Sequence, residues 1–489
     1  MFRTLAALVP KDKDLPERAW SNDVLARFLD DSIYDVLAYD FHQEYTDSNE
    51  YIPIAKRAPS VRYQLCKVVV SDSVSFLFSE NHFPEIDCGD NGEEAEDTFA
   101  AIIKDTRLNE TMLDAATRGS VGSACVWVRV LGSRLFFKAL STTYLTPTFK
   151  PDAPDTLAKV TEQYKVKGSV LREQGYAVAD DELMSDWWFR REWDDKAETW
   201  FLPWRVKDDD ATLKIDKAKT VKHNLGFVPM VWVLNLPGGD DVDGSCTFKG
   251  AVENSIEINY QLSQAGRGLK YSSSPTLVIK QDNPQAAQTK VVGDALIVPT
   301  EGDAKLLEIG GDAAKAVVEY TREIRKLALE SIGGSRADAD KLSAATSGRA
   351  MEMMNQSLIW LADKLRISYG EGALLKVLKM VAALSRTMKL VDSDGAPIKP
   401  IPEGVKITLK WPSYYAPTST DRNEDANALN ILTGANIMSQ ETATKAIAAV
   451  YDIEDTDAER ALIAGEVADA QAAQMALAAA KPKPVVNKN

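Results

Sequence analysis

Apolar residues in the first 120 positions recur every three or four residues, which is the spacing of a helix with one buried face. The pattern predicts helices over residues 17–39 and 97–117, the second ending at Gly119. Ser60 is a suitable N-cap for another helix running to Phe78, although the valines of this stretch would also suit a buried strand. The front of the chain is therefore expected to be helical.

Alternating apolar and polar positions replace the helical period from residue 123 onward. Two alternating stretches on either side of residues 131–133 predict one β-hairpin, and two Trp-rich stretches around residues 194–197 predict another. The strand pattern continues to Asn235. The middle third of the chain is therefore expected to be rich in β-structure.

Helical spacing returns in the second half of the chain. Two helices are predicted over residues 247–270 and 312–332, and short apolar stretches near Thr276, Ala295 and Lys305 predict a small β module between them. The next residues contain glycines and charges without an apolar stripe, so residues 333–341 are expected to form an exposed loop.

The longest helical pattern covers residues 349–388. Gly370 and Gly372 fall in its middle and weaken the helical hydrogen-bond ladder, so a kink is predicted there. Short strands around residues 405–411 follow. Three more helices are predicted, over residues 421–432, 439–450 and 457–480, and the last residues are expected to be disordered.

Charge and composition narrow the possible functions. The 489 residues include 57 lysines and arginines against 72 aspartates and glutamates, a formal net charge of −15. This balance argues against a tight, stationary DNA-binding protein, but not against a protein that lets DNA pass, because repulsion prevents sticking. The four cysteines form no CxxC pair, which argues for synthesis in a reducing compartment. Without a membrane-length apolar run or a signal-peptide pattern, we expect a cytosolic protein.

The sequence lacks the motifs of common enzyme classes. It contains no P-loop, no G-x-S-x-G elbow and no H-E-x-x-H pair. Acidic clusters at residues 93–97, 208–210 and 240–244 offer oxygen ligands for Ca²⁺ or Mg²⁺, but none has EF-hand spacing, and we expect solvated loops. We therefore expect no enzyme activity, no cofactor and no metal site. The three histidines, each expected to be a surface or packing residue, are His42, His82 and His223.

Five of the ten tryptophans lie between Trp187 and Trp204. A cytosolic hydrolase that stacks sugars on these rings would be one explanation, and it would need two carboxyl groups about 5 to 10 Å apart in a cleft. Alternating tryptophans are also what a half-buried sheet needs, and we expect packing rather than sugar binding.

Four short motifs occur in order along the chain. Residues 223–229 read H-x-x-G-x-x-P ahead of an apolar strand, and residues 245–253 with Asn259 and Ser263 lead into the helix predicted from residue 247. Residues 346–351 contain S-G-x-A-[LM] at the opening of the long helix, and Gly434 with residues 439–442 forms G-x-x-x-x-S-x-E-T. These motifs and the order of the predicted elements resemble the portal proteins of tailed bacteriophages, which are head-to-tail connectors.

The resemblance implies an α+β portal fold, mainly helical, assembled as a ring of twelve copies. It implies the following parts: a wing (1–246), first stem helix (247–273), clip (274–311), second stem helix (312–332), tunnel loop (333–347), long kinked helix of the wing (348–388), return strands of the wing (389–418), helical crown (419–480) and disordered tail (481–489).

The function that the resemblance implies is a channel at one capsid vertex of the virion. Viral DNA would be packaged through it by the terminase large subunit, retained, and later ejected, and the ring would join head to tail. The implied partners are further copies of the chain, the major capsid protein and scaffold, head-completion or tail adaptor proteins, and double-stranded DNA passing without sequence specificity, with no membrane. Synthesis would take place in the host cytoplasm.

Two sets of site residues follow from the resemblance. The tunnel loop offers Arg336 and Lys341 as transient DNA contacts, although solvated loop charges explain them equally well. The full loop set is Ser335, Arg336, Asp338, Asp340 and Lys341. Apolar stem residues would pack against a neighbouring subunit, with burial inside one subunit as the alternative. They are Phe248, Val252, Ile256, Val317, Val318, Ile324 and Leu327.

Overall fold

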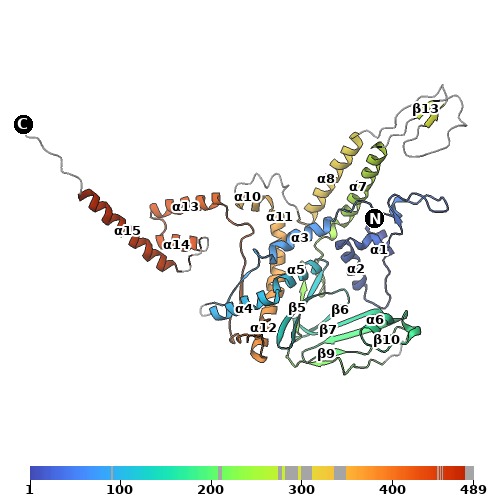
Figure 1. The fold of residues 1–489 in the computed structure, drawn as a ribbon, viewed down its shortest axis with the longest axis horizontal. Coiled ribbons are helices and arrows are strands. Elements are labelled where there is room, and N and C mark those ends of the chain that lie inside the picture. Colours follow the sequence, from blue (N-terminus) through green and yellow to red (C-terminus); the bar gives the residue numbers. More distant parts are fainter. Residues whose placement is uncertain are drawn as a thin grey trace, which may run out of the picture. The chain divides into compact units, whose positions relative to one another are not determined.

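The computed structural model has an α+β fold whose internal contacts divide the chain into two units (Figure 1). Unit 1 comprises Met1–Ala337 and Asn355–Tyr414, and unit 2 comprises Asp338–Met354 and Tyr415–Asn489. The structure describes residues 1–89, 92–207, 212–273, 278–280, 296–298, 311–334, 348–448, 451, 453 and 455–479.

The front of unit 1 is helical, as the sequence predicts, but its helices are shorter. The first long helix ends at Leu29 and is followed by a 3-10 helix, Ser32–Val36, rather than continuing to residue 39. Residues 65–78 are a helix and not a strand, so the helical alternative is confirmed, but the predicted Ser60 cap is wrong, because the helix begins at Leu65 with Gln64 at its N-cap. The helices are α1 (Phe2–Leu8), α2 (Glu17–Leu29), α3 (Leu65–Phe78), α4 (Glu93–Thr106) and α5 (Leu108–Gly119).

The single helix predicted over residues 97–117 is wrong, because Arg107 breaks it into α4 and α5. Arg107 adopts a left-handed backbone with φ of 51°. After the break, α5 packs against the sheet and α3 and buries Leu108, Met112 and Ala115 completely. The helical period of the sequence continues across the break, so pattern alone does not reveal it.

Two antiparallel sheets form the β-rich middle of unit 1. The smaller has the order β12-β4-β5, and Gly132 and Ser133, both with positive φ, make the tight turn predicted for its hairpin. Its strands are β4 (Ser123–Leu131), β5 (Arg134–Ser141) and β12 (Met230–Leu234).

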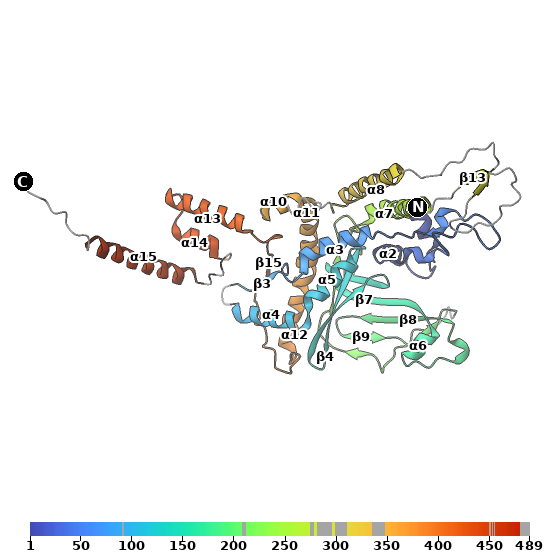
Figure 2. The same cartoon turned by 45° about the horizontal axis from the view of Figure 1, so that its top comes forward.

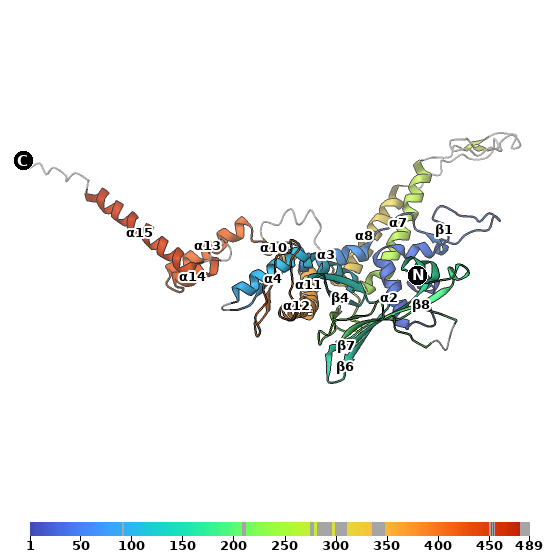
Figure 3. The ribbon, with the colours of Figure 1, turned by 60° about the horizontal axis from the view of Figure 1, so that its bottom comes forward.

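The larger sheet has the order β11-β9-β8-β7-β6, with β10 also paired to β8. Figure 3 shows β6 and β7 as a long hairpin. Trp127 of the small sheet meets Trp193 of the large one edge to face, with ring centroids 5.3 Å apart. The strands are β6 (Leu145–Lys150), β7 (Ala153–Lys167), β8 (Asp186–Trp193), β9 (Ala197–Trp200), β10 (Trp204–Arg205) and β11 (Val221–Lys222), and a short helix, α6 (Gly168–Glu173), follows β7.

The rest of unit 1 returns to the helical front. A strand, β15 (Thr408–Lys410), pairs with β3 (Glu85–Asp87). The segment predicted as return strands therefore pairs with a strand from the first hundred residues. A short parallel pair joins β1 (Tyr39–Asp40) to β2 (Arg57–Ala58).

Unit 2 is a set of helices with little buried surface. A capping box begins α13, in which Thr418 and Asp421 satisfy each other's backbone N–H groups. No residue of α13 or α14 is buried. The three carboxy-terminal helices confirm the predicted ones, and the helices of this unit are α10 (Gly348–Met354), α13 (Ser419–Gly434), α14 (Gln440–Ala448) and α15 (Thr456–Ala479).

Candidate functional site: the paired helices α7 and α8

Two long helices, α7 (Val252–Ser273) and α8 (Gly311–Ser331), lie side by side in all three views (Figure 2). Both predicted helices are therefore confirmed, although a 3-10 turn, Lys249–Ala251, precedes α7. Between them the structure describes β13 (Val278–Lys280) paired in parallel with β14 (Leu296–Val298). The third strand predicted near Lys305 lies outside the described residues.

The first half of α7 is anchored on the helical front by polar side chains. Asn259 donates from Nδ2 to the Tyr34 hydroxyl at 2.8 Å and accepts from the Tyr63 N–H at 2.7 Å. The Ser263 hydroxyl accepts from the Val61 N–H at 2.9 Å. The Asn259–Tyr34 bond is buried and the other two are partly buried, so this end of the helix pair has a defined orientation on the helical front.

Tyr260 adds another anchor to the same face of α7. Its hydroxyl donates to the backbone oxygen of Arg57 at 2.7 Å, and burial raises the pKa of Tyr260 to about 12. The hydroxyl therefore stays protonated at neutral pH and serves as a donor rather than as an acid or base.

The predicted stem residues divide into three groups by burial. Phe248, Val252 and Ile256 are buried in the hydrophobic core of their own chain, which is the alternative of burial within one subunit. Val317 and Ile324 are half-buried. Val318 and Leu327 are exposed, and they have apolar surface left for another molecule.

One side of α8 is covered and another is open. Thr321, Ala328 and Leu329 are buried. Tyr320 is 50% exposed and Leu327 is 54% exposed, and their seven-residue separation places them on one strip of the helix. A helix pair covers only one face of each helix, and here an apolar strip of α8 remains uncovered in the single chain.

The tunnel-loop residues Ser335, Arg336, Asp338, Asp340 and Lys341 lie outside the described residues. Their proposed DNA contacts consequently stay predictions.

The long helical segment changes its hydrogen-bonding pattern around the two predicted glycines. It consists of α10, α11 (Gln356–Leu365), a π-helical segment (Arg366–Leu374) and α12 (Leu375–Thr387). Gly370 lies against Trp411, whose ring atom would be 2.4 Å from an added Cβ, whereas Gly372 has only ordinary contacts. A π segment is a frequent site of helix distortion, and Gly370 also gives the Trp411 ring room to approach the backbone.

The helix predicted over residues 349–388 is also interrupted at a second position. Asn355 separates α10 from α11 with a non-helical backbone, although it is itself buried.

The tryptophan-rich sheet packs around an arginine of its own. The Arg191 guanidinium lies 4.3 Å from the Trp193 ring centroid and 4.7 Å from that of Trp200. It also forms ion pairs with Glu162 at 2.8 Å and Glu198 at 3.4 Å. Two of the five clustered tryptophans and two carboxylates of the sheet are thus engaged with Arg191.

Other reactive groups are held in structural roles. The His82 ring nitrogens bond the Ser79 hydroxyl and the Tyr414 backbone oxygen, and His42 is exposed. Burial raises the pKa of the Cys66 thiol to about 12 and that of Cys246 to about 11, so neither is a thiolate at neutral pH.

The acidic clusters also have local structural explanations. Residues 93–97 begin α4, where carboxylates favour the helix N-terminus. Two backbone N–H groups in the loop at 240–244 hold the pKa of Asp240 below its usual value. The cluster at 208–210 lies outside the described residues. Within the described part of the chain, no group of three or more potential ligands could hold a metal ion, and no helix is long and apolar enough to span a membrane.

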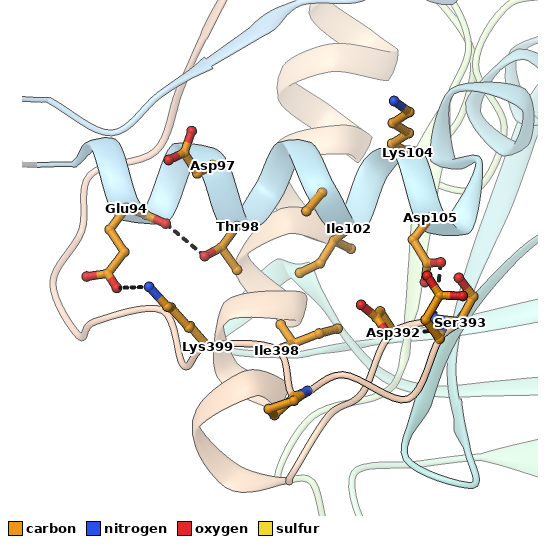
Figure 4. Close-up of a pocket in the computed structure, with 13 residues that line it drawn as sticks. Glu94, Asp97, Thr98, Ile102, Lys104, Asp105, Asp392, Ser393, Ile398 and Lys399 are labelled. Atoms are coloured by element: carbon orange, nitrogen blue, oxygen red, sulfur yellow. Dashed lines mark hydrogen bonds and ion pairs between the residues drawn. The ribbon is translucent and has the colours of Figure 1, made fainter.

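One groove has no signal in the sequence. It lies between α4 and residues 392–399, and its sides are joined by the ion pair of Lys399 with Glu94 at 2.7 Å (Figure 4). The Ser393 N–H donates to Asp105 at 3.2 Å, which joins the same two segments. Nearly three hundred residues separate these segments, so local pattern could not bring them together.

No protein-family model matches this sequence, and no curated protein matches it either.

Proposed function

We propose that the chain is a portal protein, which forms a twelve-membered ring at one capsid vertex and gives viral DNA a channel for packaging, retention and ejection. The observation that carries this proposal is the helix pair α7–α8, anchored at one end and open along an apolar strip of α8. Exposed apolar side chains at helical spacing suit a contact with another copy.

The order of parts around this pair supports the same proposal. A β-containing insertion connects α7 to α8, a long segment with a π turn follows, and a separate helical unit ends the chain. In the proposed ring, α7 and α8 form the stem, the insertion forms the clip, and α13 to α15 belong to the crown. The terminase and the adaptor proteins would bind at the clip.

The chain's charge suits a channel that does not bind its contents. With a formal net charge of −15 per copy, a ring repels phosphates overall, which lowers friction on a moving duplex. Arg336 and Lys341 are proposed as transient DNA contacts, with solvated loop charges as the equal alternative.

A mass measurement combined with electron microscopy tests the proposal. Twelve copies of the 53.7-kDa chain form a particle of about 0.6 MDa with a central opening, and we expect this species at assembly concentrations. Species of one to four copies without an opening would contradict the proposal. So would purified virions in which antibody labelling finds this chain absent from the tail vertex.

A further inference from the structure

The surface around α4 combines two grooves with an excess of carboxylates, and we call it the α4 surface. One groove, of about 520 Å³, lies between α4 and residues 392–399 (Figure 4). The other, of about 760 Å³, lies on the opposite flank of α4, beside β3. Asp97 and Lys104 line both grooves, so α4 is a ridge between them. The carboxylates of the first groove, against only two lysines, are Glu94, Asp97, Asp105, Asp392 and Asp394.

The α4 surface has an apolar floor and fixed walls. Ala101, Ile102 and Ile398 line the first groove between the carboxylates. The loop that forms its outer wall is held by a turn in which the Asp392 N–H donates to the Ala396 oxygen at 3.0 Å. Preformed walls lower the entropy cost of docking a partner.

A second surface of unit 1 has the opposite charge, and we call residues 212–222 the basic strip. Lys214, Lys217 and Lys222 are exposed there, and their ammonium groups form no ion pair with any residue that the structure describes. Ile215 is 52% exposed and Val221 is 56% exposed beside them. The strip is therefore both cationic and apolar. The acidic residues 208–210 precede it and lie outside the described residues.

The basic strip is also held in place. The Leu202 N–H donates to the Lys214 oxygen at 2.8 Å, and the Asp216 N–H donates to the Trp200 oxygen at 2.7 Å. The strip ends in β11, the edge strand of the large sheet. Among the described strands β11 pairs only with β9, so its side chains have defined positions at an edge where a partner can dock.

We propose that the basic strip of one copy docks onto the α4 surface of a second copy of this chain. The lysines would meet carboxylates such as Asp97 and Asp394, and Ile215 and Val221 would cover the apolar floor. The strip pairs with β9 whereas α4 packs on α5, β3 and β5, so the contact joins two different surfaces. Such a head-to-tail contact repeats from copy to copy and closes a ring when the rotation allows.

Ring closure through this contact rests on the proposed function, whereas the contact itself does not. Charge reversal on each side tests it, with Asp97→Lys plus Asp394→Lys as the α4 variant and Lys217→Glu plus Lys222→Glu as the strip variant. Sedimentation velocity over a concentration series should show association weakened about tenfold or more in each variant. A chain that carries all four changes should regain association.

Mixing the two variants gives a sharper result. The intact strip of the α4 variant can dock onto the intact α4 surface of the strip variant, and the two reversed surfaces also carry opposite charges, so the mixture should regain the association that each variant alone has lost. A carbodiimide, which joins carboxylates to amines, should link residues 212–222 of one copy to residues 93–105 or 390–399 of the other. Isotope labelling of one variant identifies links between copies.

Matched controls separate this contact from general charge effects. Asp152→Lys and Lys138→Glu reverse exposed charges elsewhere and should leave association unchanged. If both double variants associate as the unmodified chain does, the contact is overturned, and the lysines serve only to keep the edge strand soluble. If rings near 0.6 MDa still form in that case, the proposed function stands without this contact.

Discussion

Arg18 and Asp243 form a two-point ion pair, although 225 residues separate them in the sequence. Arg18 Nη2 donates to Asp243 Oδ1 at 2.8 Å, Nε donates to Oδ2, and Nη1 donates to the Thr142 oxygen at 2.8 Å. The pair ties α2 to the β4–β5 hairpin and to the loop that leads into α7. It therefore connects the helical front, the small sheet and the proposed stem.

Asp243→Ala should lower the free energy of unfolding by about 2 to 3 kcal/mol, because the largely buried Arg18 guanidinium loses its charged partner. Urea denaturation measures the change. Asp241→Ala is the matched control, since Asp241 is exposed two residues away and should change stability by less than about 0.5 kcal/mol. Equal effects of the two substitutions would contradict a specific role for the pair.

The two glycines of the long helical segment should respond differently to alanine. Gly370→Ala places a methyl group against Trp411, whose ring also packs on Phe78 and Arg366, so we expect a loss of about 1 to 3 kcal/mol. Gly372→Ala meets only ordinary contacts and should be neutral or stabilising by up to about 1 kcal/mol. Thermal denaturation of the two variants measures the difference. Equal losses for Gly370→Ala and Gly372→Ala would instead indicate a helix kink that requires both glycines.

Acidification should destabilise the fold partly through His223. Burial lowers the pKa of His223 below its usual 6.5, so the unfolded chain binds a proton more readily than the folded one. Its contribution to stability is complete above pH 6.5 and is lost as the pH falls below that value. The free energy of unfolding should therefore decrease from pH 7 to pH 5.

His223→Asn tests this assignment. The asparagine oxygen can replace Nδ1, which accepts from the Leu225 N–H at 3.3 Å, but it does not titrate. The variant should show a shallower pH slope than the unmodified chain in paired denaturation series. Identical slopes would mean that other groups cause the acid sensitivity.

The open strip of α8 should matter for assembly but not for the fold of one chain. Leu327→Ser changes an exposed side chain, so the free energy of unfolding should change by less than about 0.5 kcal/mol. Association should weaken about tenfold per interface when the apolar contact is lost, as measured by sedimentation. Leu131→Ser, at an exposed leucine of the β4–β5 hairpin, should leave association intact. If the Leu327→Ser variant assembles normally, the open strip of α8 is not part of the proposed interface.

Deletion of residues 335–341 addresses the tunnel loop. If the loop touches DNA and does not build the ring, rings should assemble normally while DNA packaging or retention falls. Ring mass and the DNA content of particles are the two measurements. Rings that fail to form would make the loop an architectural element instead.

The sequence alone determined most of the local structure and the mixed α+β class. Residues 247–270 and 312–332 have a helical period that local spacing reveals, and residues 132–133 make the expected hairpin turn. Side-chain periodicity is a property of neighbouring residues, so it can be read without knowing the fold.

Only the tertiary structure decided which surfaces meet. The α7 stripe at Val252 and Ile256 enters the chain's own core, while Leu327 of α8 remains open, although both stripes look alike in sequence. The Arg18–Asp243 pair and the groove beside α4 likewise depend on residues far apart in the chain. Burial and pairing depend on residues that are distant in the sequence. Local spacing contains no information about which distant segment will pack against a given stretch.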